Sequence, residues 1–273
     1  MQVVRIADHA FFQCNSLVTV EIPDGVVDIG GRAFSDCDAL CMVHIPDSVV
    51  SIGGCAFSYT EYLEYLYEQQ GSDWVALGNG IHYVYMGNET DVTIPEGIES
   101  FDMNSSDVQR VTVPAGITTI NSYTFYTCRK LTEVRLPEGI TRIGCGAFCY
   151  CTSLADITLP NGITEIEASA FSICGKLKKI VIPDGVTSIK DGTFSMDEAL
   201  ASITIPDSVT SIDFFAFVGC DSLKELTIPD SVTDIFLPYG LEFGDMREIA
   251  LVCGEGSAAW QFAEDYGFEH RAP

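Results

Sequence analysis

The chain has 273 residues, with 39 acidic against 14 basic side chains and a formal net charge of −25. This excess of negative charge excludes nucleic acid as a partner, because phosphate backbones are bound mainly by clustered Lys and Arg. No apolar run of about 18 residues occurs, so we expect no membrane-spanning helix.

A proline returns every 23 residues over most of the chain. The prolines in this register are Pro23, Pro46, Pro114, Pro137, Pro160, Pro183, Pro206 and Pro229. A fixed period of this length is typical of a solenoid, in which each coil stacks only on its neighbours. The sequence therefore predicts a single elongated domain over residues 1–273.

Each repeat contains the same short pattern, shown whole by residues 131–137 (LTEVRLP). Its apolar residues alternate, which predicts a strand with one buried face. Polar turn residues follow the proline. A second apolar pair (Val209 and Ile212 in one repeat) and a phenylalanine (Phe217) complete the unit. Stacking would bury one Phe, one Leu and several aliphatic side chains per coil.

The unit over residues 200–220 resembles the BspA-like leucine-rich repeat, and the resemblance covers nearly the whole chain. It implies a β-rich leucine-rich repeat solenoid of the α/β class, a right-handed coil of about nine to ten repeats with a concave parallel sheet. It also implies a non-enzymatic binding module for a protein or glycan. Many members of the family are bacterial surface or secreted proteins that take part in adhesion, so the resemblance implies that location too.

The N-terminal residues already fit the repeat. Ile6, Phe11, Cys14 and Leu17 occupy its Ile, Phe, Cys and Leu columns, so the sequence predicts neither a signal peptide nor a capping segment. Solenoid ends normally carry a cap over the open strand edge. We expect either a fragment of a longer protein, which we favour, or a first rung covered by a partner, with end-to-end self-association as one way to cover it.

The period breaks between Pro46 and Pro95, which are 49 residues apart instead of 46. We expect Leu63 and Leu66 to keep the strand columns, and the rest of residues 59–91 to form a hairpin or loop insertion with turns at 78–80 and 87–88. The next repeat is short and has no phenylalanine in its Phe column.

The insertion is rich in aromatic residues with polar tips, which are enriched in binding surfaces. Insertions on repeats also often mark a functional face. The candidate binding residues are Tyr62, Tyr65, Tyr67, Trp74, Tyr83 and Tyr85. The alternative is that these rings form the insertion's own small core, which the alternation of Tyr83 and Tyr85 fits.

The outward positions of the expected concave sheet are mostly threonine, as β propensity explains. Arg110 and Arg135 are further candidate binding residues on this face. Ion pairs with Glu133 and Asp156 are a more expected arrangement for them than an anion site.

Six of the 11 cysteines fall in one column of the repeat. They are Cys14, Cys37, Cys128, Cys151, Cys174 and Cys220. We interpret them as a structural ladder of buried thiols, because free Cys behaves as a small apolar residue. The odd total argues against a disulfide framework. No second Cys pair or histidine accompanies Cys145 and Cys149 at a zinc-ligand spacing, so we expect no metal and no other cofactor.

The four histidines, His9, His44, His82 and His270, lie in different columns or near opposite ends. No His–Ser or His–Cys pairing recurs at a spacing that stacks, and no phosphate-binding loop occurs, so the sequence predicts no enzyme. The alternatives to an adhesive binding module are an intracellular structural scaffold and the targeting arm of a larger protein that is truncated before Met1.

Residues 246–273 are predicted to form a C-terminal cap. A last strand over 246–251 precedes a short helix from Ala258 to Tyr266, with Ser257 as N-cap and Gly267 at its end. We expect Trp260, Ala263 and Tyr266 to share the face that covers the last coil.

Overall fold

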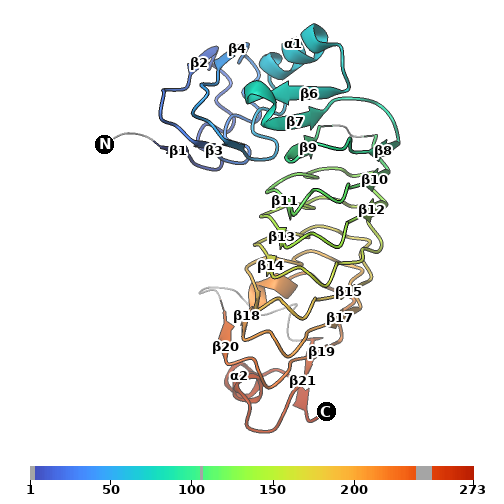
Figure 1. The fold of residues 1–273 in the computed structure, drawn as a ribbon. Coiled ribbons are helices and arrows are strands. Elements are labelled where there is room, and N and C mark those ends of the chain that lie inside the picture. The colour runs from blue at the N-terminus through green and yellow to red at the C-terminus, as the bar shows by residue number, and fades with distance from the viewer. Residues whose placement is uncertain (1–3, 105–106, 238–247) are drawn as a thin grey trace.

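The computed structural model describes residues 4–104, 107–237 and 248–273. The chain winds into stacked coils whose neighbouring strands pair in parallel, apart from one antiparallel hairpin (Figure 1). Partner residues in adjacent regular coils are 23 apart, as in Val111 opposite Val134. The period of the sequence is therefore the period of the coil.

A strand precedes most of the repeat prolines, and these strands and the equivalent strand of the last coil lie on one face, which we call the concave face. Its strands are β2 (Thr19–Glu21), β4 (Met42–His44), β8 (Asp91–Thr93), β10 (Arg110–Thr112), β12 (Glu133–Arg135), β15 (Lys179–Val181), β17 (Ser202–Thr204), β19 (Glu225–Thr227) and β21 (Ala250–Val252). In these strands the middle residue points into the coil, as the buried Val111 and Ile180 do.

A second short strand follows each turn. These strands are β1 (Arg5–Ile6), β3 (Asp28–Ile29), β5 (Ser51–Ile52), β9 (Phe101–Met103), β11 (Thr119–Ile120), β13 (Arg142–Ile143), β14 (Glu165–Ile166), β16 (Ser188–Ile189), β18 (Ser211–Asp213) and β20 (Asp234–Phe236). A bend then carries the chain past the phenylalanine and back to the next coil.

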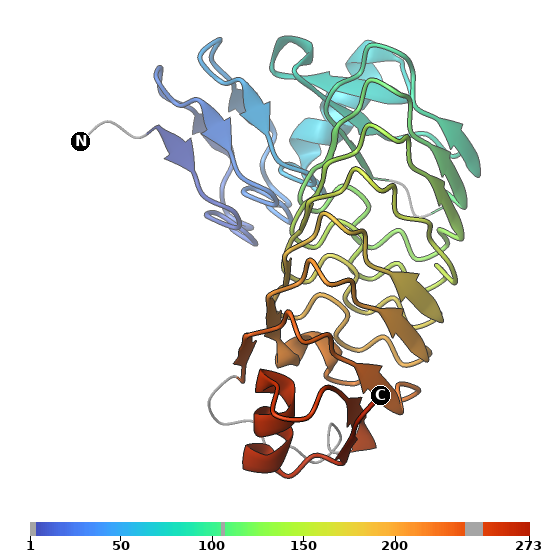
Figure 2. The same cartoon turned by 60° about the horizontal axis from the view of Figure 1, so that its bottom comes forward.

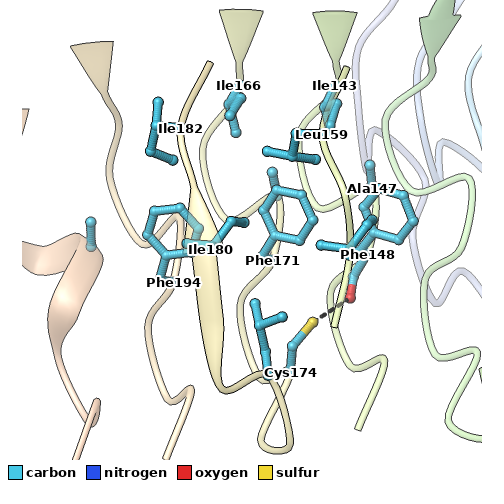
Figure 3. Close-up of a cluster of buried hydrophobic side chains, with 14 of the residues drawn as sticks. Ile143, Ala147, Phe148, Leu159, Ile166, Phe171, Cys174, Ile180, Ile182 and Phe194 are labelled. Atoms are coloured by element: carbon cyan, nitrogen blue, oxygen red, sulfur yellow. Dashed lines mark hydrogen bonds between the residues drawn. The ribbon is translucent and has the colours of Figure 1, made fainter. Parts of the chain in front are cut away.

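The phenylalanine column fills the centre of the coils. Phe148, Phe171 and Phe194 stack nearly parallel, with ring centroids 5.2 and 5.9 Å apart (Figure 3). Each of these rings is fully buried. Offset stacking of this kind adds to the free energy of burying the rings.

Five of the six column cysteines are buried, and each thiol donates to a main-chain carbonyl of the preceding coil. Cys174 Sγ, for example, lies 3.2 Å from the carbonyl oxygen of Phe148 (Figure 3). Burial raises the pKa of Cys128 and of Cys220 to about 12, so these thiols keep the proton that they donate. Cys14, in contrast, is exposed, because no described coil precedes it. The expectation of a buried thiol was wrong for this residue.

The interruption after the third coil begins with a helix where strand residues were expected. Helix α1 spans Glu61–Gln70, Thr60 caps it by accepting from the Leu63 N–H, and it ends at Gly71 with a φ of 58°. Leu63 is buried, but the expected strand is wrong. The N-cap and the apolar residues three and four apart explain why this segment is helical.

A hairpin follows the helix, formed by β6 (Trp74–Leu77) and β7 (His82–Tyr85) around the 3₁₀ turn η1 (Gly78–Gly80). In this turn Asn79 adopts a positive φ of 57°, which Asn tolerates better than most residues. Strand β7 also pairs in parallel with β9. The hairpin thus takes the place of the second strand of one missing coil.

The buried apolar side chains form two clusters that meet at this hairpin. One extends from Ile22 to Val84 and the other from Tyr85 to Phe268. We call residues 4–60 the N-terminal stack and residues 91–271 the C-terminal stack. Figures 1 and 2 show the N-terminal stack set at an angle to the C-terminal stack. The expectation of one solenoid over residues 1–273 did not foresee this division of the core.

The C-terminal end is covered by α2 (Ala258–Tyr266), which begins after Ser257 and ends at Gly267, and by β22 (His270–Arg271), which pairs with β21. The helix buries Ala259, Phe262 and Ala263. Of the expected face, Ala263 is buried and Trp260 is half-buried against the core, but Tyr266 is 42% exposed and was wrongly placed there. Phe262 instead packs on Phe214 of the 3₁₀ turn η2 (Phe214–Phe217). Residues 246–247 of the expected last strand lie outside the described residues. Neither described helix is long and apolar enough to cross a membrane.

Candidate binding surface

Most aromatic residues of the insertion are packed rather than presented to solvent. Tyr85 is buried, Tyr62, Tyr67, Trp74 and Tyr83 are half-buried, and Tyr65 is 53% exposed. The Trp74 ring lies 5.1 Å from Tyr85 and 6.3 Å from Phe101, measured between centroids. This arrangement favours the alternative that the rings form the core of the insertion. Tyr65 is the most exposed of the six candidates.

Tyr62 is likewise packed against the core and is not presented to solvent. Its ring meets Phe57 edge-on at 5.6 Å, on the last coil of the N-terminal stack. Burial raises the pKa of the Tyr62 hydroxyl, because the charged phenolate would lose its hydration there. A substitution of Tyr62 would therefore affect the packing of the core more than the binding of a ligand.

The two candidate arginines of the concave face are engaged in ion pairs. Arg110 pairs with Asp91 on the adjacent strand, and Arg135 Nε lies 2.7 Å from Glu133 Oε1. Lys179 and Asp156 form a longer pair of 3.9 Å on the same face. Ion pairs were the expected arrangement, although Arg110 takes Asp91 as its partner in place of Glu133 or Asp156. Exposed pairs such as these contribute little to stability.

The parallel sheet of the concave face is interrupted in the middle of the C-terminal stack. Strand β12 ends one sheet and β15 begins the next, while residues 151–160 contain no strand between them. Between β15 and β17 the coils are joined at this level, for example from Ile182 N to Thr204 O at 3.0 Å, whereas β17 and β19 again lie in separate sheets. No described main-chain hydrogen bond joins residues 156–159 to the strand on either side. We call this interruption the sheet break.

A groove of about 670 Å³ lies on the sheet break, and we call it the concave groove. Its lining includes charged residues from β10, β12 and the following coil, namely Arg110, Glu133, Arg135, Glu138 and Asp156. The groove also reaches Val134, Ile157 and Leu159, which are less than a tenth exposed. Its volume falls within the usual range of ligand pockets. Main-chain N–H and C=O groups that a sheet would normally pair are free to meet a ligand there.

A buried polar network that the sequence did not indicate lies between the two stacks. His82 Nδ1 is 2.7 Å from Ser100 Oγ, and His82 Nε2 is 3.2 Å from Asp102 Oδ2. The residue types are those of a hydrolytic triad, but His82 and Asp102 are 0% and 1% exposed, so a substrate cannot reach the imidazole. The three residues come from the part of the chain where the period fails, which is why no repeating spacing pointed to them.

Within the described residues, no group of three or more His, Cys, Asp or Glu side chains is placed to hold a metal ion. The buried cysteines of the repeat column in particular donate their thiol hydrogens to main-chain carbonyls.

Comparison with solved structures finds the same architecture in bacterial proteins. A leucine rich cell surface protein from Faecalibacterium prausnitzii is 23% identical, with 90% of this chain and 66% of that chain covered and a TM-score of 0.42. The pneumococcal vaccine antigen PcpA is 18% identical, with coverage of 98% and 71% and a TM-score of 0.50. A leucine-rich repeat protein from Bacteroides ovatus is 20% identical, with coverage of 100% and 88% and a TM-score of 0.33. At these identities the likeness shows the fold alone.

No curated protein matches the chain. The family model described as BspA type leucine rich repeat region does match, in six copies, over residues 1–105, 79–201 and 118–237. These matches span most of the chain, including the interruption with its helix and hairpin. The chain belongs to the BspA-type leucine-rich repeat family.

Proposed function

We propose that the chain is a binding module that recognises a protein ligand through the concave groove. Leucine-rich repeats are in general a protein-binding, non-enzymatic fold, which supports this proposal. We further propose that the module belongs to a cell-surface or secreted bacterial protein and serves adhesion, as membership of the family suggests. Protease treatment of intact source cells tests this location, since release of peptides such as residues 191–224 requires an exposed chain.

The sheet break is the observation that carries the proposed binding site. In an unbroken parallel sheet, each interior strand uses its N–H and C=O groups on both edges, and nothing remains for a ligand. At the break these groups remain unpaired and border a groove of about 670 Å³. An extended polypeptide presents alternating donors and acceptors, which suits such an edge better than a ligand without them.

A substitution that fills the groove tests the proposal. Thr158 lies in the groove, and Thr204 occupies the same outward column two coils further along. Peptides selected from a random display library on the unmodified protein serve as the probe. We expect Thr158→Trp to weaken their binding by about tenfold or more, the effect of losing about 1.4 kcal/mol of binding free energy.

Thr204→Trp is the matched control, because it adds the same ring to the same face outside the groove. We expect it to change the dissociation constant less than about twofold, the usual outcome away from the centre of an interface. Equal affinity of both variants for the selected peptides would show that the peptides do not bind in the concave groove.

A further inference from the structure

The bends of regular coils are joined by one recurring hydrogen bond. A bend residue with positive φ donates its N–H to a carbonyl 22 residues later, in the next coil. Examples are His9 N to Gly31 O at 3.0 Å, Arg32 N to Gly54 O at 3.0 Å, and Tyr123 N to Cys145 O at 2.9 Å. The rule holds in both stacks and does not depend on the side chain at the bend.

Cys55 is the bend residue at the end of the N-terminal stack, and its next coil lacks the bend. The residue 22 positions later is Leu77, which lies in the hairpin. Instead, Asp102 Oδ2 accepts the Cys55 N–H. The side chain of β9 therefore replaces the main-chain acceptor that the missing bend would have supplied. Without it, a buried N–H would lose its partner, which is costly.

Asp102 is held in turn by His82, and Ser100 positions His82. His82 Nε2 of β7 reaches the same carboxylate oxygen at 3.2 Å, and Ser100 Oγ reaches His82 Nδ1 at 2.7 Å. Asn121 of the C-terminal stack donates to Ser100 Oγ at 2.8 Å. Since Ser100 already accepts from Asn121, its own proton is available to His82 Nδ1, which leaves the Nε2–H for Asp102. We call Cys55, His82, Ser100, Asp102 and Asn121 the junction network.

The two stacks also touch directly beside this network. Gly54 N donates to Ser122 O at 3.1 Å, which joins the last N-terminal coil to the C-terminal stack. The guanidinium carbon of Arg32 lies 4.5 Å from the centroid of the Phe12 ring and 4.2 Å from that of the Tyr126 ring, one ring from each stack. These contacts need the stacks to keep one relative orientation.

We infer that the junction network fixes the orientation of the N-terminal stack relative to the C-terminal stack, with Asp102 as a substitute acceptor and His82 and Ser100 as its positioning residues. The Asp102 carboxylate belongs to the C-terminal side of the interruption and the Cys55 N–H to the N-terminal side. The network therefore spans the place where the core divides, and the angle between the stacks depends on it.

Amide hydrogen exchange of the Cys55 bend tests the inference directly. Asp102→Ala removes the acceptor, and we expect the amides of residues 53–57 to exchange at least about tenfold faster, the effect of losing a buried hydrogen bond. Asp102→Asn keeps an oxygen where Cys55 and His82 both reach it. We expect it to retain the exchange rate of the unmodified protein within about twofold.

A truncation within a regular coil is the matched control. Ser172 Oγ is buried and lies 3.0 Å from Ser195 Oγ in the C-terminal stack. We expect Ser172→Ala to speed exchange in its own coil and to leave residues 53–57 unchanged. If Asp102→Ala does not fold, Ser100→Ala provides the same comparison, with a smaller expected increase of about threefold at residues 53–57.

Small-angle X-ray scattering gives the second measurement. Asp102→Ala is expected to raise the radius of gyration and broaden the distance distribution, whereas Asp102→Asn and Ser172→Ala keep both. The inference is wrong if Asp102→Ala retains the exchange rate of residues 53–57 and the scattering profile. It is also wrong if Asp102→Asn loosens the junction as much as Asp102→Ala, because a charge and not an acceptor would then be required.

Discussion

Asp197 allows a direct test of how burial inside this solenoid shifts the pKa of a carboxyl group. It stands in the cysteine column, one coil after Cys174, and is fully buried. Its Oδ1 accepts from Cys174 N at 2.7 Å, and its Oδ2 has no hydrogen-bond partner among the described residues. Burial raises its pKa from 3.8 to about 9, since the ionised carboxylate would lose its hydration. Asp197 is therefore protonated in the folded protein at neutral pH.

The raised pKa makes stability fall as pH rises. Between pH 3.8 and about 9 the folded state keeps a proton on Asp197 that the unfolded state releases. The stabilising effect of that proton is complete below the unfolded pKa and is lost as pH rises through the folded one. At 1.36 kcal/mol per pH unit, the loss is about 4 kcal/mol by pH 7 and about 7 kcal/mol by pH 9.

Chemical denaturation of the unmodified protein and of Asp197→Asn at pH 5, 6, 7 and 8 measures this effect. The amide still accepts from Cys174 but does not titrate, so the difference in unfolding free energy between the two proteins should grow in favour of Asp197→Asn by about 1.4 kcal/mol per pH unit. Asp191→Asn, an exposed change in the same coil, is the control and should give no such trend. A difference that stays constant from pH 5 to 8 would refute the buried, protonated state of Asp197.

Three further outcomes are expected. Gly54→Ala places a Cβ against Ser122 O and should destabilise the protein by about 1–3 kcal/mol in urea denaturation, whereas Gly175→Ala, with no heavy atom within 4 Å, should stay within about 0.5 kcal/mol. Cys14 is exposed and should react with a thiol reagent in the native protein, while buried cysteines of its column should react only after unfolding; equal labelling, mapped by mass spectrometry, would contradict the thiol ladder. Val4, Phe11 and Val18 are exposed apolar residues of the first described coil, so sedimentation should show a concentration-dependent dimer that Val18→Lys weakens; a monomer at every concentration would oppose self-association through these residues.

The repeating columns explain how much of the fold could be predicted from the sequence. In a solenoid each coil touches only its neighbours, so a residue's surroundings are set by its column and by the coils one period away. The stacking of Phe148 on Phe171 and the 23-residue register of Val111 and Val134 follow from that rule alone. Local signals were equally sufficient for α2, where Ser257 and Gly267 mark its two ends.

The candidate site could be predicted less well from the repeat columns. Aromatic residues chosen for their polar tips proved to be packed, because helix α1 places Tyr62 against Phe57 and the hairpin places Trp74 against Phe101, and the sequence could not indicate these contacts. The sheet break is likewise absent from the sequence, since residues 154–160 carry the same residue types as the coils on either side.

Only the tertiary structure decided the features at the interruption. Cys55 and Asp102 are 47 residues apart, and Gly54 and Ser122 are 68 apart, separations that belong to no multiple of the repeat. The sequence by itself determined the coil, the columns and the family, because these depend on contacts repeated at one interval. The angle between the stacks, the junction network and the concave groove depend on contacts made once, after the chain has folded back on itself, and such contacts leave no period to detect.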